Sequence, residues 1–463
     1  MRTVAFSRTR ATAPGENEGE KQNLSTPSMN NERLKDFRQA AYELLVQAKD
    51  ATFELMDAVM TTPNASCLAE FSLNPLFKRQ WASIYEALQD TRPDRKKLME
   101  LYLEQLQKEA PPTEHILVAI DHTAWGRRDA KTLKDRTHEY QRGSIVGQGY
   151  SAIAWIPEAQ GSWALPLLHE RISSGSSPIL QAASQFKLVC EQSVNPVLAV
   201  LDREYGNACW VLALTQASIP ADCLMRVRKN ACLWSAPPAY SGRGRPRKHG
   251  QKMRLNDPTT WLQEDTSIEI DEHPDLGKVR VRQWLNLHFY RAAEHPINLI
   301  LIERMKPMSN GQPFPPLWLA WVGERTLPLE TVWFKYLRRF GVDHWYRFAK
   351  QRLHWTLPNL RTPEQSERWS DLMPLMSWQL WLARDLVVEN VLPWQSANIS
   401  LTPGRVAQSM FSLLVDIGTP TKMPKQRGKS PGWEKGRVRT VAPRYPTVKK
   451  RVSRRKKSSK LVI

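Results

Sequence analysis

Two short apolar runs, each followed by an aspartate, constrain the fold of this chain more than any other feature. Ile116–Ile120 precedes Asp121, and Val197–Leu201 precedes Asp202. Short apolar runs bounded by turn-forming residues are typical of buried strands. An aspartate after one strand is equally well explained by turn formation, so neither run is informative alone. Together they predict an α/β core with two carboxylates at strand ends.

The order of the predicted elements narrows the fold class. Strand-like runs cover residues 115–121, 144–156 and 162–168, a helical pattern covers 179–192, and a further strand covers 196–201. Three strands, a helix and a fourth strand is the order of an RNase H-like core, although periodicity alone does not separate it from other α/β folds. We predict such a core, interrupted by a β-rich insertion, with an N-terminal α-helical domain and a basic, disordered C-terminal tail.

The charge of the chain indicates a polyanionic partner. The formal net charge is +20, and residues 421–463 alone contain sixteen Lys or Arg and one Glu. Such a tail displaces counterions from nucleic acid and binds it without sequence preference. An anionic membrane surface is the weaker alternative because the tail has no apolar helical face to insert, and a merely solubilising tail is a third interpretation. No apolar run reaches membrane-spanning length, and the N-terminus lacks a secretory signal, so we expect a cytoplasmic protein.

A second basic segment lies at 242–250 and reads Gly-Arg-Gly-Arg-Pro-Arg-Lys-His-Gly. Proline keeps such a segment extended, and arginines are attracted to the negative potential of a narrow minor groove. The segment resembles an AT-hook, and a disordered basic loop is the alternative. The side chains expected to contact DNA here are Arg243, Arg245, Arg247 and Lys248.

A third acidic residue lies on a predicted long helix at about 329–353. Tyr336, Arg339, Asp343 and Lys350 fall on one face of that helix at 100° per residue, with Arg347 beside them. A solvated helix face with ion pairs at i,i+4 has the same pattern. Cutting and joining phosphodiesters, however, requires carboxylates that hold two divalent cations, and cations beside the cut phosphate position it.

The spacing Tyr336-x2-Arg339-x3-Asp343-x6-Lys350 resembles the YREK signature of a large group of bacterial insertion-sequence transposases in the DDE superfamily. Asp121 and Asp202 lie in contexts similar to the first two acids of that family, and the strand-rich segment at 231–328 resembles its insertion. The third acid of the family is Glu, whereas this chain has Asp343, whose side chain is one methylene shorter.

The resemblance implies the roles of these residues. Asp121, Asp202 and Asp343 would be the catalytic metal ligands for two Mg²⁺ ions, for which Mn²⁺ can substitute, and Tyr336, Arg339, Arg347 and Lys350 would hold DNA. The protein would act as a homodimer on double-stranded element ends and target DNA, in a bacterial cytoplasm and associated with the nucleoid. The expected domains are a disordered extension (1–30), a helical DNA-binding domain (31–110), the first part of the core (111–230), the insertion with its basic loop (231–328), the second part of the core with the catalytic helix (329–395), and a C-terminal segment with the tail (396–463).

Three functional interpretations remain from the sequence. The first is an active transposase that cleaves element ends and transfers strands. The second is a transposase relic that binds DNA but does not cut it, because Asp343 does not complete the metal site. The third is another RNase H-like nuclease, such as a junction resolvase, which the β-rich insertion and the Tyr-Arg-Asp-Lys face argue against.

Overall fold

The computed structural model describes residues 27–450, apart from short gaps at 113–114, 141–142, 159–160, 220–221, 274–276, 308–310, 324–327, 390, 395–400, 427–431, 433 and 439. Most of the predicted N-terminal extension, residues 1–26, lies outside the described residues. So does the end of the predicted tail, residues 451–463.

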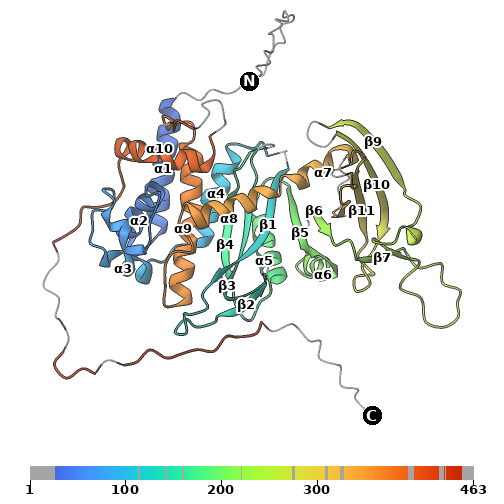
Figure 1. The fold of residues 1–463 in the computed structure, drawn as a ribbon, viewed down its shortest axis with the longest axis horizontal. Helices are drawn as coiled ribbons and strands as arrows, with labels where there is room; N and C mark the ends of the chain where they lie inside the picture. Colours follow the sequence, from blue (N-terminus) through green and yellow to red (C-terminus); the bar gives the residue numbers. More distant parts are fainter. Residues whose placement is uncertain are drawn as a thin grey trace, which may run out of the picture.

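Helices from both ends of the chain pack into one layer, seen in Figure 1 as neighbouring blue and red segments. The described residues of the whole chain form the helices α1 (Pro27–Leu44), α2 (Lys49–Thr61), α3 (Ala82–Asp90), α4 (Arg95–Gln107), α5 (Pro178–Gln192), α6 (Ala208–Gln216), α7 (Leu329–Leu337), α8 (Phe340–Gln351), α9 (Pro363–Ala383) and α10 (Pro403–Ile417), with short 3-10 helices η1 (Leu68–Leu73) and η2 (Pro258–Thr260). Helices α1 and α10 both pack on α9. No helix within the described residues is both long enough and apolar enough to cross a membrane.

A ten-stranded mixed sheet forms the centre of the molecule. The strands of the described residues, of which β7 and β8 lie outside this sheet, are β1 (Ile116–Gly126), β2 (Thr137–Tyr140), β3 (Ser144–Trp155), β4 (Leu165–Ile172), β5 (Val197–Gly206), β6 (Asp222–Val227), β7 (Cys232–Trp234), β8 (Lys252–Arg254), β9 (Thr266–His273), β10 (Gly277–Leu287), β11 (Ile297–Arg304) and β12 (Leu317–Val322). The sheet order is β2-β3-β1-β5-β6-β12-β11-β10-β9, with β4 also paired to β3 and with β7 and β8 forming a separate pair.

The first part of this sheet has the predicted RNase H-like arrangement. Strand β1 pairs antiparallel with β3 and parallel with β5, and β5 pairs parallel with β6. Helix α5 connects β4 to β5 and packs on β3, which is the crossover that a parallel neighbour requires. The predicted mixed α/β fold class is therefore confirmed. The short edge strand β2 was not predicted, because its four residues Thr-His-Glu-Tyr have no apolar alternation.

The strands of the predicted insertion continue the same sheet. Strand β12 pairs antiparallel with β6, so that β12, β11, β10 and β9 extend the sheet beyond the core strands. Figure 1 shows them at one end of the molecule. Inward-facing residues of β10 and β11, among them Val281 and Leu299, are fully buried, and alternation of this kind is what made the segment recognisable as strands.

The predicted long helix at 329–353 is two helices. Helix α7 ends at Leu337 and α8 begins at Phe340, with a turn at Arg338 and Arg339 between them. The prediction of one continuous helix was wrong here, because helical periodicity continues through the turn and gives no sign of it. Helix α8 packs on β1, with its Trp345 and Tyr346 buried against His169 of β4.

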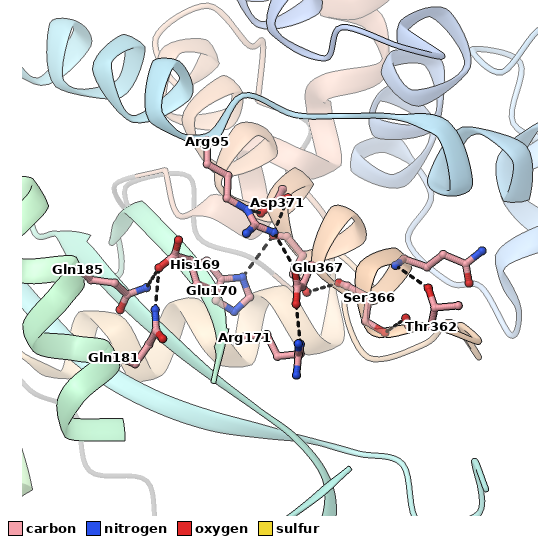
Figure 2. A network of polar contacts seen from close by, with 12 residues as sticks. Arg95, His169, Glu170, Arg171, Gln181, Gln185, Thr362, Ser366, Glu367 and Asp371 are labelled. Carbon is pink, nitrogen blue, oxygen red and sulfur yellow. Dashed lines mark hydrogen bonds and ion pairs between the residues drawn. The ribbon is translucent and has the colours of Figure 1, made fainter. Parts of the chain in front are cut away.

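Polar side chains fasten the helical layer to the sheet (Figure 2). Arg95 of α4 donates from Nε to Asp371 Oδ1 of α9 at 2.7 Å, and also reaches Glu367. Arg171 of β4 donates to the same Glu367 at 2.6 Å. Three elements from distant parts of the sequence are thereby held together.

The C-terminal segment is partly ordered against the rest of the chain. The predicted segment 396–463 contains helix α10, and residues 443–450 lie beside β2 through a parallel bridge between Val448 and Thr137. In Figure 1 the brown segment runs from the helical layer toward this edge of the sheet.

Candidate active site

Asp121 and Asp202 are adjacent because their strands are adjacent. The last parallel register pair of β1 and β5 is Ile120 with Leu201, so the two aspartates directly follow it on neighbouring strands. Both aspartates are partly buried. The structure thus brings together two residues that are 81 positions apart in the sequence.

Neither aspartate ends its strand, contrary to the sequence-based expectation. Strand β1 continues to Gly126 and β5 to Gly206. Residues 121–126 of β1 pair with β3, from Asp121 with Ala152 to Gly126 with Gly147. The antiparallel partner therefore extends β1 beyond the point at which its parallel pairing with β5 ends, which the local sequence does not reveal.

Arg339 links the α7–α8 turn to the acidic residues. Its Nη2 donates to Asp343 Oδ2 at 2.9 Å, and its side chain is 8% exposed whereas that of Asp343 is 40% exposed. Burial opposes the charge of Arg339, but Tyr336, Asp343, Asp121 and Asp202 together raise its pKa. The Nε and Nη1 atoms of Arg339 are buried without a hydrogen-bond partner among the described residues.

The pKa of Asp121 depends on the same group of charged residues. Burial raises the pKa of Asp121 to about 7, Arg339 opposes the rise, and Asp343 and Asp202 contribute to it by like-charge repulsion. The His122 backbone N–H also donates to Asp121 Oδ1 at 2.8 Å. Asp343 and Asp202 therefore both lie within electrostatic range of Asp121, and Arg339 lies within range of all three acids.

Lys350 and Arg347 lie further along α8. Lys350 donates from Nζ to Thr123 Oγ1 at 2.6 Å, and burial lowers its pKa while Asp121 opposes this effect. Arg347 is exposed. With Asp121, Asp343 and five other residues, both line a cleft of about 490 Å³.

Tyr336 and Asp202 do not line this cleft. Tyr336 is buried, and burial raises its pKa, with Arg339 opposing and Asp202 contributing. Within the part of the chain that the structure describes, no three His, Cys, Asp or Glu side chains stand close enough to hold one metal ion. Asp343 and Asp202 thus lie near enough to Asp121 to affect its pKa, but the three described carboxylates do not form one cluster of metal ligands. Asp343 pairs with Arg339 instead.

Arg243, Arg245, Arg247 and Lys248 lie outside the cleft. They occupy an exposed coil between β7 and β8. Lys248 pairs with Glu294 at 3.1 Å. The coil belongs to the insertion, so its arginines are available to a ligand at a separate place on the molecule.

Sequence reasoning missed two polar residues beside Asp121. His122 Nδ1 lies 3.1 Å from Tyr205 Oη, and burial lowers the pKa of His122, with Lys450 lowering it further. Thr123 is the partner of Lys350. Both residues directly follow Asp121 in the sequence, and that adjacency was the only available signal.

A comparison with known families identifies the family of the chain. A family model described as DDE superfamily endonuclease matches residues 42–287, which include Asp121 and Asp202 and end before Asp343. None of the curated proteins compared with the chain matches it. Since the family match covers more than half of the 463 residues, the chain belongs to the DDE superfamily endonucleases.

Proposed function

We propose that this protein is a transposase that cleaves the ends of a mobile element and joins them to new DNA. The observation that carries the proposal is the position of Arg339, which lies in electrostatic range of Asp121, Asp202 and Asp343. Its two buried donor atoms without partners suit the oxygens of a phosphate group. The membership of the chain in a family of endonucleases supports the same reaction class.

Asp121, Asp202 and Asp343 would hold the divalent cations that endonucleases of this superfamily generally use. The donor set fits Mg²⁺ or Mn²⁺, because both prefer carboxylate oxygens. Burial raises the pKa of Asp121, the nearby Asp343 and Asp202 raise it further, and a bound cation would favour its ionised form. Bound there, two cations would activate the attacking oxygen and stabilise the leaving oxygen.

The basic residues of the site would position the substrate. Arg339 would exchange Asp343 for a phosphate oxygen, which would leave the carboxylate of Asp343 available for a cation. Lys350 and Arg347, on the wall of the cleft, would contact the flanking phosphates. Tyr336 is buried beside Arg339 and would hold the guanidinium in place.

The proposed partner is double-stranded DNA, bound by a homodimer. The net charge of +20 supports a polyanionic ligand. The exposed arginines at 243, 245 and 247 support minor-groove contacts away from the cleft. Specific recognition of element ends is assigned to the helices before residue 110.

A second candidate is a lapsed transposase that only binds DNA. Two points favour it: by the resemblance to the YREK transposases, Asp343 stands where that group has Glu, and its carboxylate is paired with Arg339 at 2.9 Å. An aspartate is one methylene shorter, so it needs a shift of α8 to approach the other two carboxylates.

Mg²⁺-dependent nicking tests the proposal, with duplexes taken from the DNA that flanks the reading frame as substrate. We expect the wild type to nick and Asp343→Ala to lose nicking while duplex binding stays nearly intact, because a metal ligand contributes to chemistry more than to positioning. Glu191→Ala is the charge-matched control, since its side chain is 57% exposed on α5. A wild type that is inert while Asp343→Glu nicks would establish the second candidate. Nicking by Asp343→Ala would assign the third ligand to another acid.

A further inference from the structure

Residues 443–450, hereafter the strap, add to the edge strand β2. The Tyr445 N–H donates to Lys131 O at 2.8 Å, and the Val448 N–H donates to Arg136 O at 2.7 Å. Arg136 in turn donates from Nη2 to Tyr445 O at 3.0 Å. Val448 and Thr137 form a parallel bridge. Pairing of an extended segment with a free sheet edge is a specific docking mode, because the backbone hydrogen bonds fix its register.

The strap ends in a buried ion pair. Lys450 Nζ lies 2.6 Å from Glu139 Oε1, and the side chains are 16% and 7% exposed. Glu139 is also held by Thr137, whose hydroxyl donates to it at 2.5 Å. A side chain at Gly149 would place its Cβ 2.9 Å from Glu139 Oε2, so this glycine leaves room for the carboxylate. Thr137 and Gly149 therefore fix the position of the Glu139 carboxylate that pairs with Lys450.

The docked strap lies at the edge of the candidate active site. Glu139 of β2 is the register partner of Ile145 of β3, and Ile145 lines the same cleft as Asp121 and Asp343. Lys450 also lies within electrostatic range of His122, another residue of that cleft. The chain continues from Lys450 with six Lys or Arg and no acidic residue.

We propose that the strap is a docking element that anchors the basic C-terminus at the mouth of the cleft, so that tail and cleft contact the same segment of DNA. The inference rests on the proposed function only in that DNA is the ligand of the cleft. An unattached tail would instead find phosphates anywhere within its reach. Anchoring raises the effective concentration of the basic residues at one place without any new contact.

The length of the DNA distinguishes an anchored tail from a free one. On a short duplex of about 15 base pairs, roughly one and a half turns, the tail adds affinity only if it is held beside the cleft. On a long duplex of about six turns, a released tail still binds elsewhere on the same molecule. Affinity would be measured by fluorescence anisotropy for both duplexes, in EDTA, so that cleavage plays no part.

Val448→Pro is the main variant. It removes the N–H that pairs with Arg136 and changes no charge, and Val448 is 36% exposed, so little packing is lost. Val441→Pro is the matched control. Val441 lies just before the strap, and its side chain is 91% exposed. A chain ending at residue 450 supplies the affinity without the basic end. A second pair, Lys450→Met and Lys449→Met, removes one charge each, but only Lys450 pairs with Glu139.

We expect Val448→Pro to weaken short-duplex binding by about tenfold or more, toward the value of the truncated chain. On the long duplex the loss should be much smaller, and Val441→Pro should match the wild type on both. Lys450→Met should lose more short-duplex affinity than Lys449→Met. Amide exchange at Tyr445, whose N–H is bonded to Lys131 O, should accelerate in Val448→Pro, which would show that the strap had been released.

Three results would overturn the inference. The first is unchanged short-duplex affinity in a Val448→Pro protein whose Tyr445 amide exchanges faster. The second is a Tyr445 amide that already exchanges at the unprotected rate in the wild type, which would mean that the strap is not docked. The third is tighter binding after release, which would make the strap an inhibitor of the cleft. Failure of Mg²⁺-dependent nicking would count against the proposed function alone, since none of these measurements needs catalysis.

Discussion

The negative charge of Asp121 is unfavourable in the folded protein, because the pKa of its carboxyl group is raised. Burial and the neighbouring Asp343 and Asp202 raise its pKa to about 7, although Arg339 opposes them. A cation at this place would favour the ionised form, so binding of a divalent ion should release a proton below about pH 7. The residue therefore couples metal binding, protonation and stability.

The metal-free protein should be stabilised by Asp121→Asn at high pH. The folded-state pKa, about 7, lies above the ordinary value of 3.8. Between these two values the folded state keeps a proton that the unfolded state has lost, so stability falls as pH rises and stays low above about pH 7. We expect Asp121→Asn to gain up to about 4 kcal/mol near pH 8 and almost nothing near pH 4. Urea unfolding in EDTA at the two pH values measures this. An equal gain at both would contradict the electrostatic origin.

At the scale of elements, the network in Figure 2 joins α4, α9 and β4 around Asp371. Burial raises the pKa of Asp371 to about 6, and Arg95 opposes this by charge and hydrogen bonding. The Asp371 side chain is 6% exposed and that of Arg95 is 37% exposed. Arg95 therefore keeps an otherwise unfavourable buried carboxylate ionised from the solvent side.

Arg95→Leu should destabilise the protein in a pH-dependent way. Loss of one partner of a buried pair costs about 3 to 5 kcal/mol, and the partial exposure of Arg95 reduces this to about 2 kcal/mol near pH 8. Without Arg95 the pKa of Asp371 rises further, so the deficit should shrink as pH falls and Asp371 becomes protonated. The measurement is the free energy of unfolding of Arg95→Leu and of the wild type by chemical denaturation, from about pH 8 downward. Asp371→Asn in the Arg95→Leu background is the control and should remove the pH dependence.

For the molecule as a whole, exposed basic residues occur at two separate places, the cleft with its strap and the coil between β7 and β8. If both contact one duplex, each neutralised phosphate adds about 0.9 to the slope of log affinity against log salt. Arg243→Ala with Arg245→Ala should thus make the slope shallower by about 0.9 per arginine and reduce any preference for A·T-rich duplexes.

The control for this prediction is Lys187→Ala, an exposed position on α5 that belongs to neither proposed DNA surface. This variant should leave the slope nearly unchanged. Salt titrations of A·T-rich and G·C-rich duplexes give both quantities at once. Equal slope changes per charge removed would mean that only net charge matters.

The core of this protein was predictable because its information is local. Five consecutive apolar residues before Asp121, and five before Asp202, are sufficient to predict two buried strands. Neighbouring parallel strands then bring the two aspartates together. The face of Arg339, Asp343 and Lys350 was equally local, because it depends on helical spacing. The β-rich insertion was visible from alternation, and its fusion with the core sheet was not.

Only the tertiary structure decided how these parts meet. The turn at Arg338 and Arg339 separates α7 from α8, and Arg339 in this turn pairs with Asp343 and lies within electrostatic range of Asp121 and Asp202. The pairing of Val448 with Thr137 joins residues 311 positions apart. Such contacts depend on strand register and loop closure, to which neither periodicity nor composition responds. The sequence by itself thus determined which acids and strands were available, and packing decided which charges oppose one another and where the basic end of the chain is held.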